Sequence, residues 1–228
     1  EKGHITDFKT YLEDLHEVLT KTIYPHYPSN TRFVFIGLSL GGQLALQYLE
    51  TYKNDPVEQL ILMAPMLLFK TDPWPFGLAK NLSCLMSALG FSQEYAIGYG
   101  NYNPAAQKFM KWKTHHSIEA FTQDTTLLLE HPELRTGGPT FAWVCAAFKA
   151  IESTMDPQKL KSIHIPVTFI IASDDATVDN SYVRKAKDII PNAKLVNLEG
   201  AWHNLIRESD TYRVPILQTI ASAVEHSH

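Results

Sequence analysis

Cysteine is scarce in this sequence: 228 residues include only two, Cys84 and Cys145. Neither belongs to a Cys-x-x-Cys pair or to a Cys/His spacing typical of zinc or redox sites. We therefore expect no metal and no cofactor, and we interpret both cysteines as buried, reduced thiols.

Long apolar runs and an excess of basic residues are also absent. The longest apolar stretch, residues 60–69, is interrupted by Pro65 and is far shorter than the roughly 20 residues of a membrane-spanning helix. The formal net charge is −4, whereas nucleic-acid-binding domains usually carry a basic patch. We expect neither a membrane span nor a nucleic-acid partner, and a composition of 45% hydrophobic and 19% charged residues is that of a globular protein.

Two blocks of the sequence alternate strand and helix patterns. Continuous β-branched and aromatic runs, typical of strands buried on both faces of a parallel sheet, lie at residues 32–37, 59–63, 167–172 and 194–198. Apolar residues at helical spacing predict helices at about residues 8–19, 43–53, 182–190 and 212–224. This order predicts an α/β fold with a mostly parallel, doubly wound sheet.

A segment of different texture separates the two blocks. Residues 68–160 are rich in Trp, Tyr, Phe and Met and have helical stretches near 76–89, 116–131 and 140–153. We interpret this segment as an inserted helical cap. The predicted domains are thus a first part of the core at 1–67, the cap at 68–160 and a second part of the core at 161–228.

The strongest chemical motif is a Gly-x-Ser-x-Gly sequence at residues 37–41, between a predicted strand and a predicted helix. This is the context of a nucleophile elbow, in which Ser39 would sit on a strained turn with its hydroxyl exposed. Gly37 and Gly41 lack side chains and would therefore avoid steric clashes at the turn, and Gly42 would leave additional space there. The amide of Leu40, at the helix start, could stabilise a developing oxyanion. By itself the motif also fits an ordinary glycine-rich turn.

An acid and a base follow later strands in the order that this fold requires. The loop after residues 167–172 contains Asp174, Asp175 and Asp179. We select Asp175, because its spacing to Val178 is familiar from hydrolases, and we interpret Asp174 as a solvated loop residue and Asp179 as a helix cap. His203 follows the last strand, which predicts a catalytic triad of Ser39, Asp175 and His203.

Several segments resemble one family of α/β-hydrolases. They are Gly3-His4, residues 38–42, Ala64-Pro65-Met66, residues 95–98, residues 137–140 ahead of Trp143, and residues 200–203 with Glu208. The chain is similar over nearly its whole length to the monoacylglycerol lipase and lysophospholipase group, most closely to bacterial inner-membrane lysophospholipases.

The resemblance implies an α/β-hydrolase fold and hydrolysis of a fatty-acyl ester of a monoacyl lipid. It also implies a location in the cytoplasm or attached peripherally to the inner membrane. Met86, Phe141 and Trp143 would then line an acyl channel in the cap, although such aromatics fit the cap's own core equally well. His115 and His116 could face the site, but solvated positions at a helix end are favoured. Carboxylesterases, thioesterases and peptidases of the same fold, and an inactive binding protein, are alternatives.

The resemblance also implies about eight strands, whereas the sequence predicts four. We therefore expect an amino-terminally incomplete hydrolase without its early strands, with one unpaired edge on the strand at residues 32–37. The second oxyanion donor would belong to the missing part, because Leu40 supplies only one amide.

Overall fold

The structure is a computed structural model that describes residues 1–104 and 114–225. It divides into two compact units. Unit 1 comprises Glu1–Phe8, Lys70–Trp112 and Ser117–Glu152, and unit 2 comprises Lys9–Phe69, Lys113–His116 and Ser153–His228. No helix within the described ranges is both long and apolar enough to cross a membrane.

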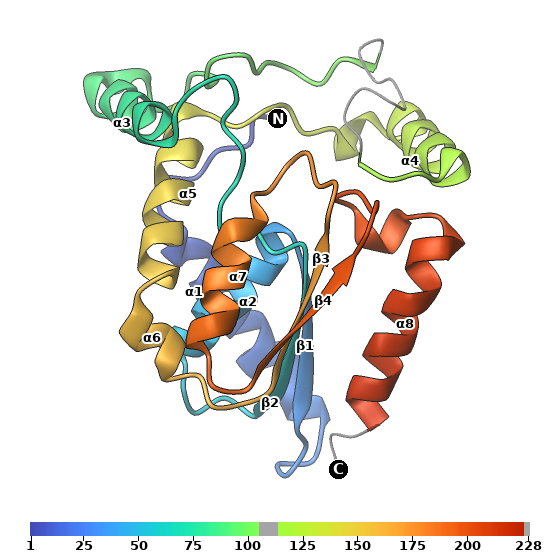
Figure 1. The fold of residues 1–228 in the computed structure, drawn as a ribbon. Coiled ribbons are helices and arrows are strands. Elements are labelled where there is room, and N and C mark those ends of the chain that lie inside the picture. Colours follow the sequence, from blue (N-terminus) through green and yellow to red (C-terminus); the bar gives the residue numbers. More distant parts are fainter. Residues whose placement is uncertain (105–113, 226–228) are drawn as a thin grey trace. The chain divides into compact units, whose positions relative to one another are not determined.

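Unit 2 contains a four-stranded parallel sheet in the order β1-β2-β3-β4 (Figure 1). The strands are β1 (Phe33–Leu38), β2 (Val57–Met63), β3 (Val167–Ala172) and β4 (Ala193–Leu198). The four predicted strands are confirmed with shifts of one or two residues at their ends. β3 is buried along its whole length, whereas β1 lies at an edge of the sheet, where Ile36 is 47% exposed.

One face of the sheet is covered by three helices from the segments that connect successive strands. They are α2 (Leu40–Thr51), α6 (Pro157–Lys161) and α7 (Asn180–Ile189). Leu46 of α2, Leu160 of α6 and Val183 of α7 join strand residues in one buried apolar cluster. Helix α1 (Lys9–Val18) packs on α2 through Leu12. This packing removes the apolar faces of the helices from water, which is the main favourable contribution to folding.

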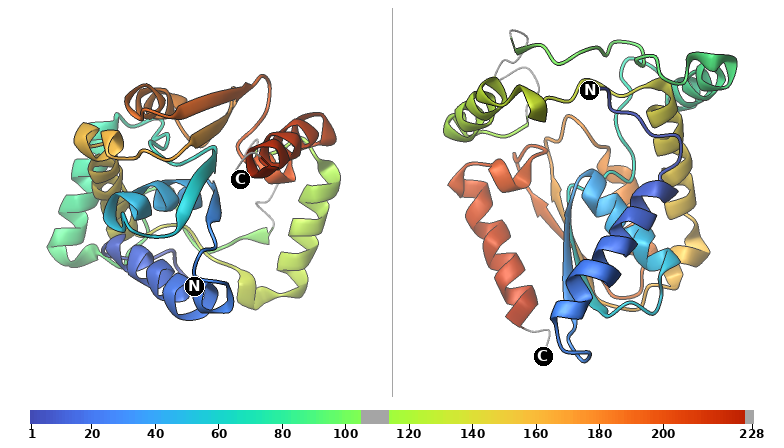
Figure 2. Two further views of the ribbon diagram at one scale, coloured as in Figure 1. Left: turned by 90° about the horizontal axis from the view of Figure 1, so that it is seen from below. Right: turned by 180° about the vertical axis from the view of Figure 1, so that it is seen from behind.

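The opposite face carries α8 (Asp210–Glu225), as the view from below shows (Figure 2). α8 leaves a gap between itself and this face of the sheet. A groove of about 840 Å³ lies between Gln59, Thr168 and Lys194 of the sheet and Gln218 and Ser222 of α8.

Unit 1 is helical, with α3 (Phe76–Met86), α4 (Ile118–Glu130) and α5 (Phe141–Thr154), the last of which ends in unit 2. The three helical stretches predicted between the halves of the core are confirmed. The prediction of reduced thiols is wrong, because Cys84 of α3 and Cys145 of α5 form a disulfide. The two cysteines are 61 residues apart, and the packing of α3 against α5 brings their side chains together. Phe76 and Phe148 make an edge contact between the same helices.

Candidate active site

Ser39 occupies the turn between β1 and α2, with φ 53° and ψ −118°. Positive φ is uncommon and strained for a residue with a side chain, so surrounding contacts must hold it. The Ser39 N–H donates to the Met63 carbonyl at 2.9 Å, and the Ser39 carbonyl accepts from the Met66 N–H at 2.9 Å. Ala64, between these partners, also has a positive φ of 40°. The sequence therefore folds locally as a strained strand-to-helix turn tied to the end of β2.

Two of the three glycines named for this turn, Gly37 and Gly42, are required sterically. A Cβ at Gly37 would lie 2.6 Å from the Gly41 carbonyl oxygen, and a Cβ at Gly42 would lie 2.9 Å from Cβ of Pro65. A Cβ at Gly41 would meet nothing within 4 Å. The expected steric need at Gly41 is thus wrong, because the Cα–Cβ direction there points into open space. At Gly42, which lies against Pro65, the expected steric need is confirmed.

Asp175 is held in the loop after β3 by backbone donors. Its Oδ1 accepts from the N–H groups of Thr177 at 2.7 Å and Val178 at 2.9 Å. The residue is only 3% exposed. Because both amides point at Oδ1, Oδ2 remains to face His203.

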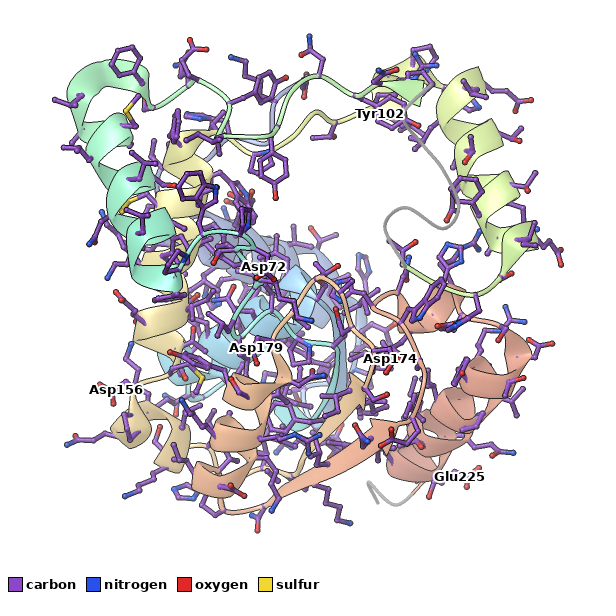
Figure 3. The ribbon with its side chains drawn as sticks, turned by 45° about the horizontal axis from the view of Figure 1, so that its top comes forward. Asp72, Tyr102, Asp156, Asp174, Asp179 and Glu225 are labelled. Atoms are coloured by element: carbon purple, nitrogen blue, oxygen red, sulfur yellow. A yellow bond between two sulfur atoms is a disulfide. The ribbon has the colours of Figure 1, made fainter. Side chains whose placement is uncertain are left out.

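The other two carboxylates of this loop lie elsewhere (Figure 3). Asp179 is the N-cap of α7 and accepts from the Ser181 N–H at 2.8 Å, which confirms its predicted role. Asp174 is exposed and accepts from the hydroxyl of Ser173.

His203, in the loop after β4, links the other two members of the predicted triad. Its Nδ1 lies 2.7 Å from Asp175 Oδ2, and its Nε2 lies 2.9 Å from Ser39 Oγ. The imidazole side chain is 12% exposed. With the proton on Nδ1, Nε2 can accept the Ser39 hydroxyl proton, so the three side chains form one chain of hydrogen bonds. The structure thus brings Ser39, Asp175 and His203 together within unit 2.

Leu40 is the first residue of α2. The first N–H groups of a helix lack intrahelical acceptors, and the helix dipole favours negative charge there. This is the amide predicted to stabilise an oxyanion at Ser39.

Three predicted lining residues, Met86, Phe141 and Trp143, lie in unit 1. Phe141 is 7% exposed and therefore belongs to the interior of that unit. Trp143 packs edge-on against Phe8, with ring centroids 5.4 Å apart. Met86 ends α3 and is half-buried.

The two adjacent histidines differ from the expectation of solvated helix-end residues: His115 is buried, and the His116 side chain is only 33% exposed. His115 is 3% exposed, and His116 binds the buried carboxylate of Glu208. Helix α4 begins only at Ile118, so neither histidine belongs to its end. Spacing could not indicate the contact with Glu208, which lies 92 residues away. Among the described residues, no group of three or more His, Cys, Asp or Glu is arranged to hold a metal ion.

Comparison with known proteins identifies the family. Residues 1–210 match the model of the Hydrolase_4 family, described as serine aminopeptidase, S33. A probable lysophospholipase L2 from Haemophilus influenzae is 26% identical over 231 residues, covering 96% of this chain and 67% of the relative. Lysophospholipase L2 from Escherichia coli K12 is 23% identical over 225 residues, covering 96% and 64%. The chain thus spans about two thirds of the length of these curated relatives.

The fold also has solved neighbours. A soluble variant of monoglyceride lipase from Saccharomyces cerevisiae, in complex with a substrate analog, has a TM-score of 0.74 at 15% identity, covering 98% of this chain and 71% of that one. This likeness, with the parallel sheet and its helices, shows the α/β-hydrolase fold. The chain is thus similar to lysophospholipases and to a monoglyceride lipase, and it belongs to the Hydrolase_4 family of α/β-hydrolases.

Proposed function

We propose that this protein is a serine hydrolase that cleaves fatty-acyl esters of monoacyl lipids, a lysophospholipid or a monoacylglycerol, through an acyl-enzyme. The observation that carries the proposal is the pair of hydrogen bonds of His203, at 2.9 Å to Ser39 Oγ and 2.7 Å to Asp175 Oδ2. A base within this distance of a hydroxyl, itself oriented by a carboxylate, is the arrangement that activates a serine.

In the proposed mechanism, Ser39 Oγ attacks the ester carbonyl carbon while His203 Nε2 takes the hydroxyl proton. The Leu40 N–H stabilises the negative charge on the carbonyl oxygen. The tetrahedral intermediate collapses to an acyl-Ser39 ester, and His203 returns the proton to the departing alcohol. Water then attacks the acyl carbonyl carbon as His203 takes one of its protons, and His203 returns this proton to Ser39 Oγ as the fatty acid departs. Throughout, Asp175 keeps the Nδ1–H tautomer and stabilises the imidazolium.

The lipid substrate is supported by similarity to lysophospholipase L2 and to a monoglyceride lipase. It is also supported by apolar side chains that unit 1 leaves exposed on or beside α3. Leu78, Leu85 and Leu89, at spacings of seven and four residues, are 48%, 55% and 63% exposed. Such a helix face is compatible with an acyl chain or with peripheral contact with a lipid surface.

The proposal is tested by turnover of monoacylglycerol, lysophosphatidylcholine, lysophosphatidylethanolamine and p-nitrophenyl esters of graded acyl length. We expect long-chain substrates to be preferred over acetyl esters. Trp143→Ala and Met86→Asp should lower long-chain turnover more than acetyl turnover, because only a long chain would contact them. Equal losses on both substrates would indicate that these residues form the core of unit 1.

A peptidase is the second candidate, because the matching family model is described as a serine aminopeptidase. Aminoacyl p-nitroanilides therefore belong in the same panel. Faster cleavage of these amides than of any ester would indicate that the substrate is a peptide and not a lipid.

A further inference from the structure

We propose that Glu208 and His116 form a positioning clamp that fixes the loop carrying His203. The inference rests on the proposed role of His203 as general base. Glu208 lies between a short 3-10 helix (Leu205–Arg207) and α8, and it is 1% exposed.

Both carboxylate oxygens of Glu208 are occupied by donors. Oε1 accepts from the Trp202 N–H at 2.8 Å and from Nδ1–H of His116 at 2.9 Å. Oε2 accepts from the His116 N–H at 2.9 Å and from the Ser209 N–H at 3.0 Å. One buried carboxylate thereby joins the residue before His203 to the segment 114–116.

The residue after His203 is joined to the same segment. The Asn204 N–H donates to the Thr114 carbonyl at 2.6 Å. Both neighbours of His203 are thus tied to the segment 114–116. Trp202 is tied through Glu208, which binds His116, and Asn204 is tied directly to Thr114.

Ring stacking adds to these hydrogen bonds. The His116 imidazole stacks on the Trp202 indole, with centroids 3.8 Å apart and planes 30° apart. Tyr212 of α8 lies against the same imidazole, with centroids 5.2 Å apart. Rotation of the Trp202 backbone would therefore disturb both the Glu208 hydrogen bond and the stack.

The clamp needs a carboxylate because its four donors, the three N–H groups and Nδ1–H, require two accepting oxygens. In Glu208→Gln, one oxygen becomes an NH₂ donor. With the NH₂ at the Oε1 position, the Trp202 N–H loses its acceptor, whereas Nδ1–H of His116 can still donate to the remaining oxygen at 3.1 Å. With the NH₂ at the Oε2 position, the N–H groups of His116 and Ser209 lose theirs. The loop would shift to satisfy them, and His203 would move relative to Ser39 and Asp175.

Kinetics of p-nitrophenyl butyrate hydrolysis in the full chain test the clamp. For Glu208→Gln we expect kcat to fall about ten- to a hundredfold with an unchanged KM, since a displacement of about 1 Å can cost a hundredfold in proton transfer. Glu199→Gln, at an exposed carboxylate of the same loop, is the matched control and should keep wild-type kcat.

Two variants of His116 separate positioning from general stability. His116→Phe keeps a ring against Trp202 without a donor and should lower kcat. His116→Asn offers an amide N–H near the Nδ1 position and should restore most of it. Thermal unfolding identifies any variant that does not fold. If Glu208→Gln does not fold, the comparison of His116→Phe with His116→Asn tests the clamp.

A second readout does not require turnover. The downfield NMR resonance of the His203 Nδ1 proton, hydrogen-bonded to Asp175, should broaden or vanish in Glu208→Gln and His116→Phe and persist in Glu199→Gln. An unchanged resonance and kcat in folded Glu208→Gln and His116→Phe would overturn the clamp. If wild-type hydrolysis equals that of Ser39→Ala, the proposed function fails, while the resonance still decides about the clamp.

Discussion

Glu50 gives a prediction whose size follows from the structure. It lies near the end of α2 and is 7% exposed, and neither carboxyl oxygen has a hydrogen-bond partner among the described residues. Burial raises its pKa from 4.5 to about 8, against the opposing effect of the Lys159 ammonium and with a smaller contribution from the Asp156 carboxylate. Glu50 is therefore expected to be largely protonated in the folded protein at neutral pH.

The unfolded chain releases this proton near pH 4.5, whereas the folded protein keeps it until about pH 8. Between these values the folded state binds more protons, so the free energy of unfolding must fall as pH rises through this window. A full shift of that size corresponds to roughly 5 kcal/mol, at 1.36 kcal/mol per pKa unit. Local relaxation and entry of water reduce this value, and we expect about 2–3 kcal/mol.

The perturbation is Glu50→Gln, which keeps the side-chain shape and removes the titration. Urea unfolding of both proteins at pH 5, 7 and 9 should show similar stability at pH 5 and a more stable variant at pH 9. Glu13→Gln, at an exposed carboxylate of α1 paired with Lys9, is the control and should follow the wild type. Parallel stability curves for wild type and Glu50→Gln from pH 5 to 9 would refute the reasoning.

Two further predictions concern the acid of the triad and the disulfide. Asp175→Asn should lower kcat about ten-thousandfold, because the Thr177 and Val178 amides hold the amide oxygen of the new Asn and turn its NH₂ toward His203. Asp174→Asn should keep a kcat near that of the wild type. The reverse ranking in ester turnover would identify Asp174 as the acid. Replacing both Cys84 and Cys145 by Ser should destabilise unit 1 by about 4 kcal/mol, on the chain-entropy model for a 61-residue separation. Urea unfolding that is unchanged in this variant would contradict the prediction. So would two free thiols in the wild type, titrated after denaturation without reduction.

The sequence predicted the strands and helices of the core well, because their signals are local. The run Val167–Ala172 is continuous and β-branched, and its predicted bounds match β3. α2 begins at Leu40, three residues before the predicted start, because two glycines in its first turn weaken the helical pattern. The short helix α6 was not predicted, since five residues are too few to show a periodicity.

Contacts between distant residues could not be derived in this way. Nothing around Cys84 or Cys145 indicates that α3 packs on α5, so the disulfide was missed. The Glu208 carboxylate binds His116, which is 92 residues away, and the contact that requires Gly42 is with Pro65 after β2. The order of Ser39, Asp175 and His203 was informative because parallel strands bring their carboxyl ends to one edge of the sheet.

The central claim is that Ser39 is a nucleophile activated by His203 and Asp175. Its most direct test is to treat the folded protein with a fluorophosphonate and locate the adduct by mass spectrometry. We predict one adduct per chain, on Ser39, and no labelling of Ser39→Ala. A folded wild-type protein that is not labelled, or that is labelled equally when Ser39 is replaced, would contradict the account.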